Sequence, residues 1–144
     1  MDVRDLRVGP PRRWSEQVGG IYWLARLIDK ARASNTGCLG DYLYGQSPMD
    51  HGLLRELGFS HRRFADLVAA AGDDDSVMRR LGECDAAALE RARTWSARLP
   101  REHRLFFWFV DADDGYRDSG WLRSPINFLA NRIARTAKRV WPRK

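Results

Sequence analysis

Hydrophobic positions recur every three or four residues along most of the chain, and this spacing predicts amphipathic α-helices. The first clear case covers residues 20–34. Its apolar stripe consists of Ile21, Leu24, Leu27, Ile28 and Ala31. The small and polar residues 35–37 tolerate the left-handed backbone conformation, so we expect this helix to end there.

Stop and start signals divide the middle of the chain into further short helices. A leucine-rich helix at residues 53–57 is closed by Gly58, and Ser60 is placed to cap the next one. Three aspartates at 73–75 open a fourth helix, where the helix dipole favours negative charge. Asp85 caps a fifth helix, which Pro100 is expected to stop.

The last third of the chain contains one ambiguous segment and one clear pattern. The run LFFWFV at residues 105–110 fits a buried strand or a helix, and we favour a helix because no second strand is evident to pair with it. From Ser124 to Pro142 an apolar face continues at helical spacing. The pattern therefore predicts an all-α protein, a single compact domain of six to seven short helices with a basic amphipathic C-terminal helix.

Length and composition limit the class of protein. A chain of 144 residues fits one domain with one core. The longest apolar run, residues 105–110, is far shorter than the roughly 20 residues that a membrane-spanning helix needs. The N-terminus lacks the apolar segment of a signal peptide, and the two cysteines are widely separated. We therefore expect reduced thiols and a cytoplasmic location, with attachment to a membrane surface or a larger assembly left open.

Net charge is distributed unevenly along the chain. The whole chain carries +6, whereas residues 119–144 carry seven basic residues and no acid, so residues 1–118 sum to −1. A partner selected by charge should therefore meet the C-terminal segment first.

The segment GGIYWLARLIDKARASNTGCLGDYLYG, residues 19–45, carries a family resemblance. Together with the preceding GPPRRWSEQV it resembles a bacterial domain family of unknown function, number five thousand and sixty-nine in the catalogue of domains. The matching positions are Leu24, Arg26, Ile28, Asp29, Lys30, Ala31, Arg32, Ala33, Leu39, Gly40, Asp41, Tyr42 and Tyr44. FVDADDGYR at 109–117 resembles the end of that family, so the likeness covers about residues 8–118. The resemblance implies a helical fold and no established activity.

The same segment supplies the candidate ligand-binding residues. Polar side chains lie on one face of the predicted helix and around the corner that follows it, and they combine tyrosine, carboxylate, lysine and arginine groups. The candidates are Arg26, Asp29, Lys30, Tyr42, Tyr44 and Asp50. Such groups could bind a polar ligand or exchange protons. The other interpretation is a solvated or structural hydrogen-bond network that holds the loop, and we favour it because no spacing matches a catalytic motif.

Other motifs are weak. DADDG at 111–115 is similar to a calcium loop, but the glycine comes one position early and Leu122 replaces the expected glutamate. Ser47 is not in the sequence context of a hydrolase nucleophile. Histidines and cysteines do not occur at metal-ligand spacing, and the glycine-rich nucleotide loops are absent. We therefore expect no cofactor and no metal.

The C-terminal segment carries the candidate partner-binding residues. Its predicted helix would place large apolar side chains on one side and cations towards the other, with tryptophans near the ends. The candidates are Trp121, Arg123, Phe128, Arg132, Arg135, Lys138, Arg139 and Trp141. The apolar side could dock on the protein's own body, and the segment could equally contact nucleic acid, an anionic membrane or a protein groove.

These patterns favour a binding or adaptor module over an enzyme. Residues 1–118 would form the helical family domain, and residues 119–144 would be an extension that docks on a macromolecular or anionic partner. The alternative is a small enzyme or small-ligand binder that uses the polar corner at residues 22–51.

Overall fold

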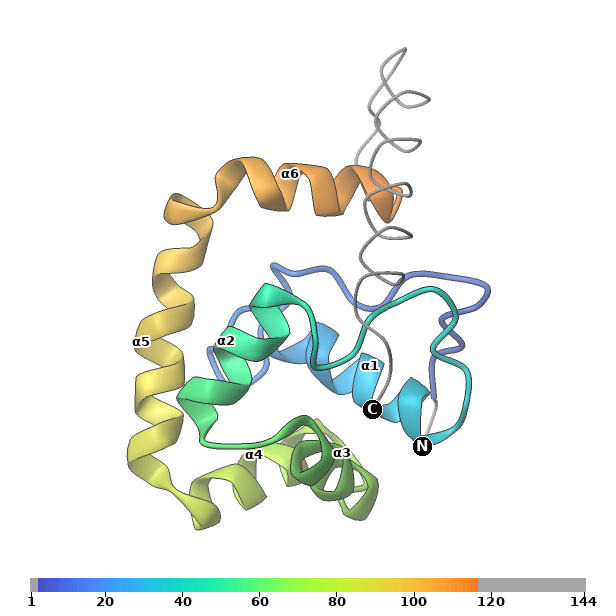
Figure 1. The fold of residues 1–144 in the computed structure, drawn as a ribbon. Helices are drawn as coiled ribbons and strands as arrows, with labels where there is room; N and C mark the ends of the chain where they lie inside the picture. The colour runs from blue at the N-terminus through green and yellow to red at the C-terminus, as the bar shows by residue number, and fades with distance from the viewer. Residues whose placement is uncertain (1–2, 117–144) are drawn as a thin grey trace. The chain divides into compact units, whose positions relative to one another are not determined.

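The computed structural model describes residues 3–116. Within this range the chain forms helices and no β-sheet, which confirms the all-α prediction. The helices, labelled in Figure 1, are α1 (Leu24–Asn35), α2 (Pro48–Leu57), α3 (His61–Ala70), α4 (Asp74–Cys84), α5 (Ala86–Glu102) and α6 (Arg104–Asp113). The chain divides into two compact units, residues 1–102 with α1 to α5 and residues 103–144 with α6. The predicted basic helix at 119–144 lies outside the described residues.

Local signals set most helix boundaries as predicted. Gly58, with φ of +73°, ends α2 in the left-handed conformation. The side chains of Ser60 and Asp73 cap α3 and α4, each accepting a hydrogen bond from the backbone N–H three residues later. Helix α2, however, begins five residues before the predicted helix at 53–57, because Ser47 caps it in the same way and Pro48 occupies the first helical position. Ser47 is therefore placed by its role in starting a helix.

The first helix begins four residues later than predicted. Val18 and Ile21 exchange two backbone hydrogen bonds, of 3.4 and 3.0 Å, around a turn formed by two glycines. Trp23 then adopts a left-handed conformation with φ of +72°, and α1 starts at Leu24. A left-handed residue other than glycine costs roughly 1–2 kcal/mol, so tertiary contacts of Trp23 must hold this turn.

The prediction that Pro100 stops the fifth helix was wrong. Helix α5 runs through Pro100 and ends at Glu102. The φ of proline is already helical, but proline cannot donate to the carbonyl four residues earlier and its ring crowds that carbonyl, at a cost of about 3 kcal/mol. Leu99 in the same turn is 1% exposed, and burial of its apolar side chain offsets this cost.

Helix α1 is the centre of the first unit. It packs against α3, while α5 packs along both α2 and α4 (Figure 1). The predicted apolar stripe of α1 is fully buried, as expected. The opposite face is buried too, because Arg26, Asp29 and Lys30 are each no more than 6% exposed. The polar face that the sequence suggested for this helix is thus inside the fold. A solvated network is therefore excluded for these three residues, and a ligand site or a buried structural network remains.

Residues 105–110 are helical, as favoured from the sequence, and form most of α6. Within this helix the rings of Phe106 and Phe107 meet edge to face, with centroids 5.4 Å apart. Asp113 ends the helix and Gly115 follows with φ of +77°. In the part of the chain that the structure describes, no helix is long and apolar enough to cross a bilayer.

Candidate functional site

Asp50 is the centre of the polar corner. It lies in the first turn of α2 and is fully buried. Its Oδ1 accepts hydrogen bonds from Trp23 Nε1 at 2.8 Å and Lys30 Nζ at 2.6 Å. Its Oδ2 accepts from Lys30 Nζ at 2.6 Å and from the backbone N–H of Gly45 at 2.9 Å. A carboxylate offers about four acceptor sites, so these contacts occupy all of them.

The partner of Asp50, Lys30, is almost as deeply buried, with 3% of its side chain exposed. Its ammonium group also lies 5.4 Å from the centroid of the Trp23 ring. Removing two charges from water is costly, and the cost is recovered only when the pair is close and its remaining hydrogen-bonding groups are satisfied. This pair meets those conditions. It joins α1, the turn before α1 and the loop before α2.

Arg26 stacks between two aromatic rings one turn before Lys30. Its guanidinium carbon lies 5.1 Å from the centroid of Trp23 and 5.5 Å from that of Tyr42. Cation–π contacts of this kind strengthen when they are removed from water, and Arg26 is 5% exposed. Tyr42 also packs on a small cluster formed by Leu6, Ala33 and Cys38.

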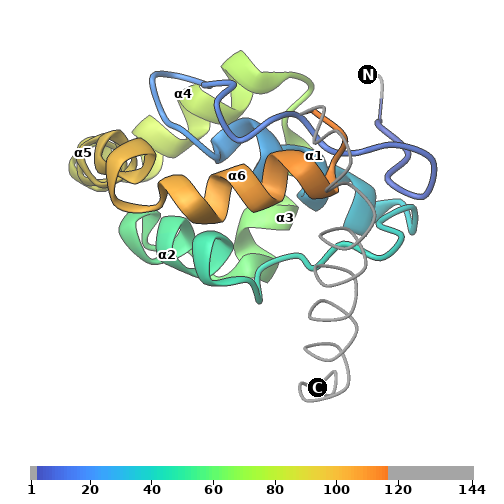
Figure 2. The same ribbon diagram turned by 90° about the horizontal axis from the view of Figure 1, so that it is seen from above.

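Asp29 belongs to a second, separate ionic network. It accepts four hydrogen bonds from Arg12, one from the backbone N–H and three from the guanidinium, at 2.8 to 3.1 Å. Arg12 also pairs with Asp74 at the start of α4, and Arg32 reaches the same carboxylate at 3.0 Å. The N-terminal segment and α4 therefore meet on one side of α1 (Figure 2).

This network changes the ionisation of its members. Burial alone would lower the pKa of Arg12, but hydrogen bonds to Asp29 and Asp74 raise it above its usual range. Burial alone would raise the pKa of Asp74, but the hydrogen bond from Arg12 and the charges of Arg12 and Arg32 lower it. The groups are therefore held as ions at neutral pH, where each neutralises its neighbours.

Tyr44 fixes the end of the loop. Its hydroxyl donates a 2.6 Å hydrogen bond to the carbonyl of His61 in α3. Burial and the nearby charge of Asp50 raise the pKa of Tyr44 well above its ordinary value, so the phenol stays protonated and remains a donor. The next residue, Gly45, has φ of +76°, and a Cβ there would lie 2.4 Å from that of His61. The loop can approach α3 this closely only with glycine.

The structure thus separates the six candidate ligand-binding residues into distinct contacts. Lys30 and Asp50 come together, and Arg26 joins them through Trp23. Asp29 instead pairs with Arg12, and Tyr44 binds the backbone of α3. Ligand binding by these residues stays a prediction. Their burial and mutual contacts favour the structural network, the interpretation preferred from the sequence.

Two important members of the networks were missed by sequence reasoning. Trp23 contributes a hydrogen bond and a stacking surface, but an aromatic residue at the start of a helix resembles any other core residue. Arg12 follows two prolines, and this pair was a usable signal, since prolines hold a segment extended. Among residues 3–116, no three histidine, cysteine, aspartate or glutamate side chains gather as a possible metal site. The eight candidate partner-binding residues, Trp121 to Trp141, lie outside the described range.

Comparison with protein families identifies the chain. Residues 8–104, about two-thirds of the sequence, match the family described as Domain of unknown function (DUF5069). The chain therefore belongs to this family, as residues 19–45 suggested. The match ends before residues 109–117, where the sequence analysis placed the end of the likeness. Among curated proteins no match is found.

Proposed function

We propose that this protein is a binding module that docks on an anionic partner through residues 119–144. One observation carries the proposal: the seven basic residues of that segment exceed the +6 net charge of the whole chain, and no acid accompanies them. On this proposal, the folded body supports a charged docking segment.

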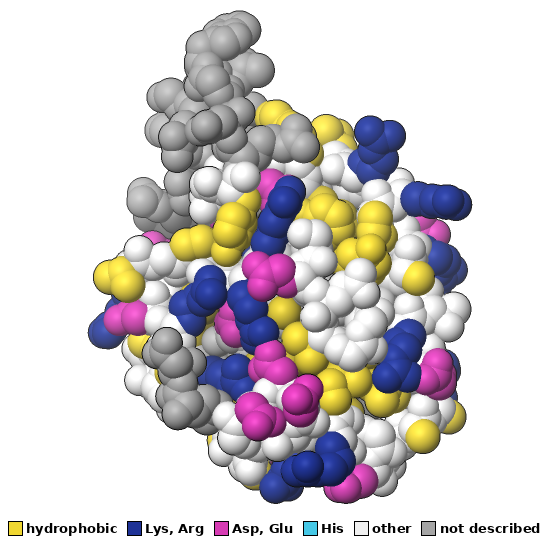
Figure 3. Space-filling view, turned by 180° about the vertical axis from the view of Figure 1, so that it is seen from behind, with side chains coloured by type: hydrophobic (Ala, Val, Ile, Leu, Met, Phe, Trp, Pro, Cys, Tyr) yellow, Lys and Arg dark blue, Asp and Glu magenta, His cyan; other side chains and the backbone are white. Residues whose placement is uncertain are grey.

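The pairing of charges in the body supports the proposal. Lys30, Arg12 and Arg32 each have a carboxylate partner within 3.0 Å. On the face drawn in Figure 3, acidic and basic side chains alternate, with no large area of one sign. Long-range attraction of an anionic surface requires unbalanced charge, and the unbalanced charge of this chain lies in its last 26 residues.

The sequence pattern favours an anionic lipid surface over the other anionic partners. Ile126, Leu129 and Ile133 recur at helical spacing, and Trp121 and Trp141 flank them. A membrane interface takes up such an apolar face and suits tryptophan, whereas contacts to nucleic-acid phosphates would leave the apolar face uncovered. Each cation near the surface adds about 1 kcal/mol of attraction. Peripheral attachment to an anionic membrane is therefore the proposed mode of docking.

Vesicle binding by the full chain tests this proposal. We expect sedimentation with phosphatidylserine-containing vesicles and little with phosphatidylcholine alone. Replacement of Arg132, Arg135, Lys138 and Arg139 by Gln should weaken binding by about two to three orders of magnitude, from four lost attractions of about 1 kcal/mol each. Added salt should weaken binding of the unmodified chain.

The control is a second variant that loses the same number of positive charges, but from the folded body. Arg62, Arg91, Arg98 and Arg101 are exposed on body helices, and their replacement by Gln should leave most vesicle binding intact. Equal losses in the two variants would overturn the role of the C-terminal segment. Binding of single-stranded RNA without binding of vesicles would assign a nucleic-acid partner instead.

A further inference from the structure

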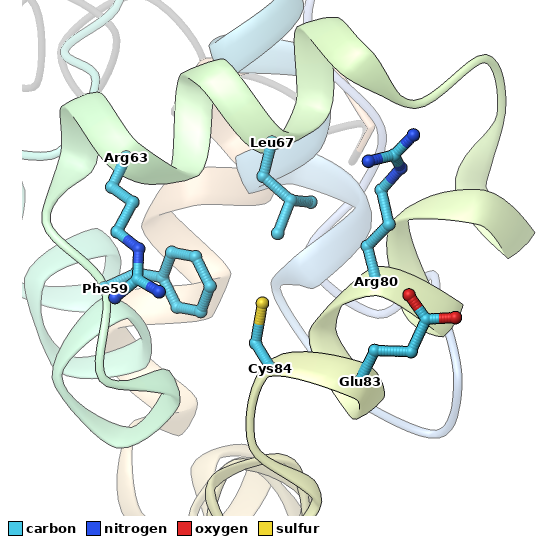
Figure 4. Close-up of a pocket in the computed structure, with 6 residues that line it drawn as sticks. All are labelled: Phe59, Arg63, Leu67, Arg80, Glu83 and Cys84. Carbon is cyan, nitrogen blue, oxygen red and sulfur yellow. The ribbon is translucent and has the colours of Figure 1, made fainter.

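A hollow on the first unit is lined by residues that belong neither to the polar corner nor to residues 119–144. It opens between α3, α4 and the residue that precedes the cap of α3, and its volume is about 320 Å³. This α3–α4 hollow is lined by Phe59, Arg63, Leu67, Arg80, Glu83 and Cys84 (Figure 4). The volume is at the small end of the range for ligand pockets.

The lining combines an apolar surface with cations on two sides. Figure 4 shows Arg63 and Arg80 on either side of Leu67, with the Phe59 ring and the Cys84 sulfur between them. The guanidinium of Arg63 lies 4.6 Å from the centroid of the Phe59 ring, so this side chain is held over the hollow. Arg63 is exposed, and this cation–π contact favours the orientation that the structure shows.

The arginines of the hollow differ from those of the ionic network. Within residues 3–116, neither Arg63 nor Arg80 has a carboxylate within ion-pair distance, whereas Arg12 and Arg32 are both paired. Glu83 is the one acid of the lining, so the six side chains carry a net charge of +1. A single negative charge would complement this lining, and a second one would be repelled by Glu83.

We propose that the α3–α4 hollow binds a small monocarboxylate with an apolar body. The apolar body would contact Phe59 and Leu67, and the carboxylate would accept hydrogen bonds from a guanidinium, whose planar donors match its two oxygens. This binding is independent of docking through residues 119–144. It also requires no movement of the buried Lys30–Asp50 pair.

Amide chemical shifts of the isotopically labelled full chain provide the test. The probe is phenylacetate, with acetate and 2-phenylethanol as partial probes that lack the ring or the charge. We expect phenylacetate to shift amides of residues 59–67 and 80–84 in a saturable manner. Neither partial probe should do so at the same concentration. Equal shifts with acetate would overturn the proposal by revealing an unspecific anion site, and no saturable shift with phenylacetate would also overturn it.

Single substitutions show which guanidinium group of the hollow binds the carboxylate of phenylacetate. Arg63→Gln or Arg80→Gln should weaken phenylacetate binding about tenfold or more, as expected for loss of a charged hydrogen bond. Arg79→Gln is the matched control, because Arg79 is exposed on α4 and lies outside the lining, and it should change affinity less than twofold. A loss with Arg79→Gln as large as with both lining variants would contradict the site. Circular dichroism of each variant checks that the helices are retained.

Discussion

At the scale of single residues, Asp50 shows how one side chain can organise a loop. Its carboxylate collects donors from Trp23, Lys30 and Gly45, which belong to three different segments. Trp23 has a left-handed backbone, and its buried indole bond to Asp50 holds that conformation in place. The same contacts exclude water from the Lys30–Asp50 pair. These two charged groups therefore hold the chain segments in position.

Replacement of Lys30 measures the energetic cost of burying the Asp50 carboxylate without its counter-charge. We expect Lys30→Met to lower the free energy of unfolding by about 3–5 kcal/mol, since it leaves a buried carboxylate without its counter-charge. Urea unfolding at neutral pH measures the change. Arg55→Gln breaks the exposed pair with Glu56 and should cost less than about 1 kcal/mol. If Lys30→Met cost no more than this control, the pair would be open to solvent and ligand binding at the corner would regain support.

At the scale of helices, a glycine sets how closely α2 approaches α5. A Cβ at Gly52 would lie 2.6 Å from Cζ2 of Trp95, closer than side chains can pack. Trp95 is part-buried on α5, which packs along α2, so a Cβ at Gly52 would require the ring or the helices to shift. Gly52 is therefore needed for close packing, although glycine is a poor helix former.

Two glycine substitutions should have opposite effects on stability. Gly52→Ala should lower the free energy of unfolding by about 1–3 kcal/mol through overpacking. Gly82→Ala in α4 meets only Leu89, at 3.8 Å, and should raise it by about 0.5–1 kcal/mol through better helix propensity. Urea titration of both variants gives the comparison. Stabilisation by Gly52→Ala would show that α2 and α5 are less tightly packed than described.

At the scale of the whole molecule, ion pairs join segments that are distant in sequence. Arg12 bonds to Asp29 and Asp74, which lie 17 and 62 residues away. The N-terminal segment is thereby fastened to α1 and to the start of α4. This network is only partly buried, so it should respond to pH and salt more than the Lys30–Asp50 pair does.

Asp74 predicts a specific dependence of stability on pH. Its pKa is lowered below the ordinary value of 3.8, so its contribution is fully present above pH 4 and is lost as pH falls through the lowered value. Asp74→Asn should therefore destabilise the protein by about 1–2 kcal/mol at pH 7 and much less near pH 2. Urea unfolding at the two pH values measures both differences.

Asp75→Asn is the control for this effect. Asp75 shares the first turn of α4 with Asp74, so both interact with the helix dipole, but Asp75 is exposed and makes no ion pair within residues 3–116. The variant at Asp75 should lose only about 0.5 kcal/mol at pH 7. A pH dependence equal for both variants would assign the effect to the helix dipole.

The sequence determined which segments are helical and where most helices begin or end, because capping and hydrophobic periodicity act over only a few residues. Gly58, Ser60 and Asp73 are boundary residues in the structure as they are in the sequence. The start of α1 was not predicted, because a tryptophan in the left-handed conformation is stable only with its distant partner Asp50. The extension of α5 past Pro100 was not predicted because the cost of the proline is offset by tertiary packing of the same turn, where Leu99 is buried.

The sequence also determined that the excess positive charge lies in residues 119–144, since charge is additive along the chain. Tertiary structure alone decided which polar groups of residues 22–51 are buried and with which partners. The partner of Asp29 is Arg12, seventeen residues earlier, and Lys30 pairs with Asp50, twenty residues later. Ion pairs depend on distance in space, and only packing of α1 among its neighbours brings these charges together and removes them from water.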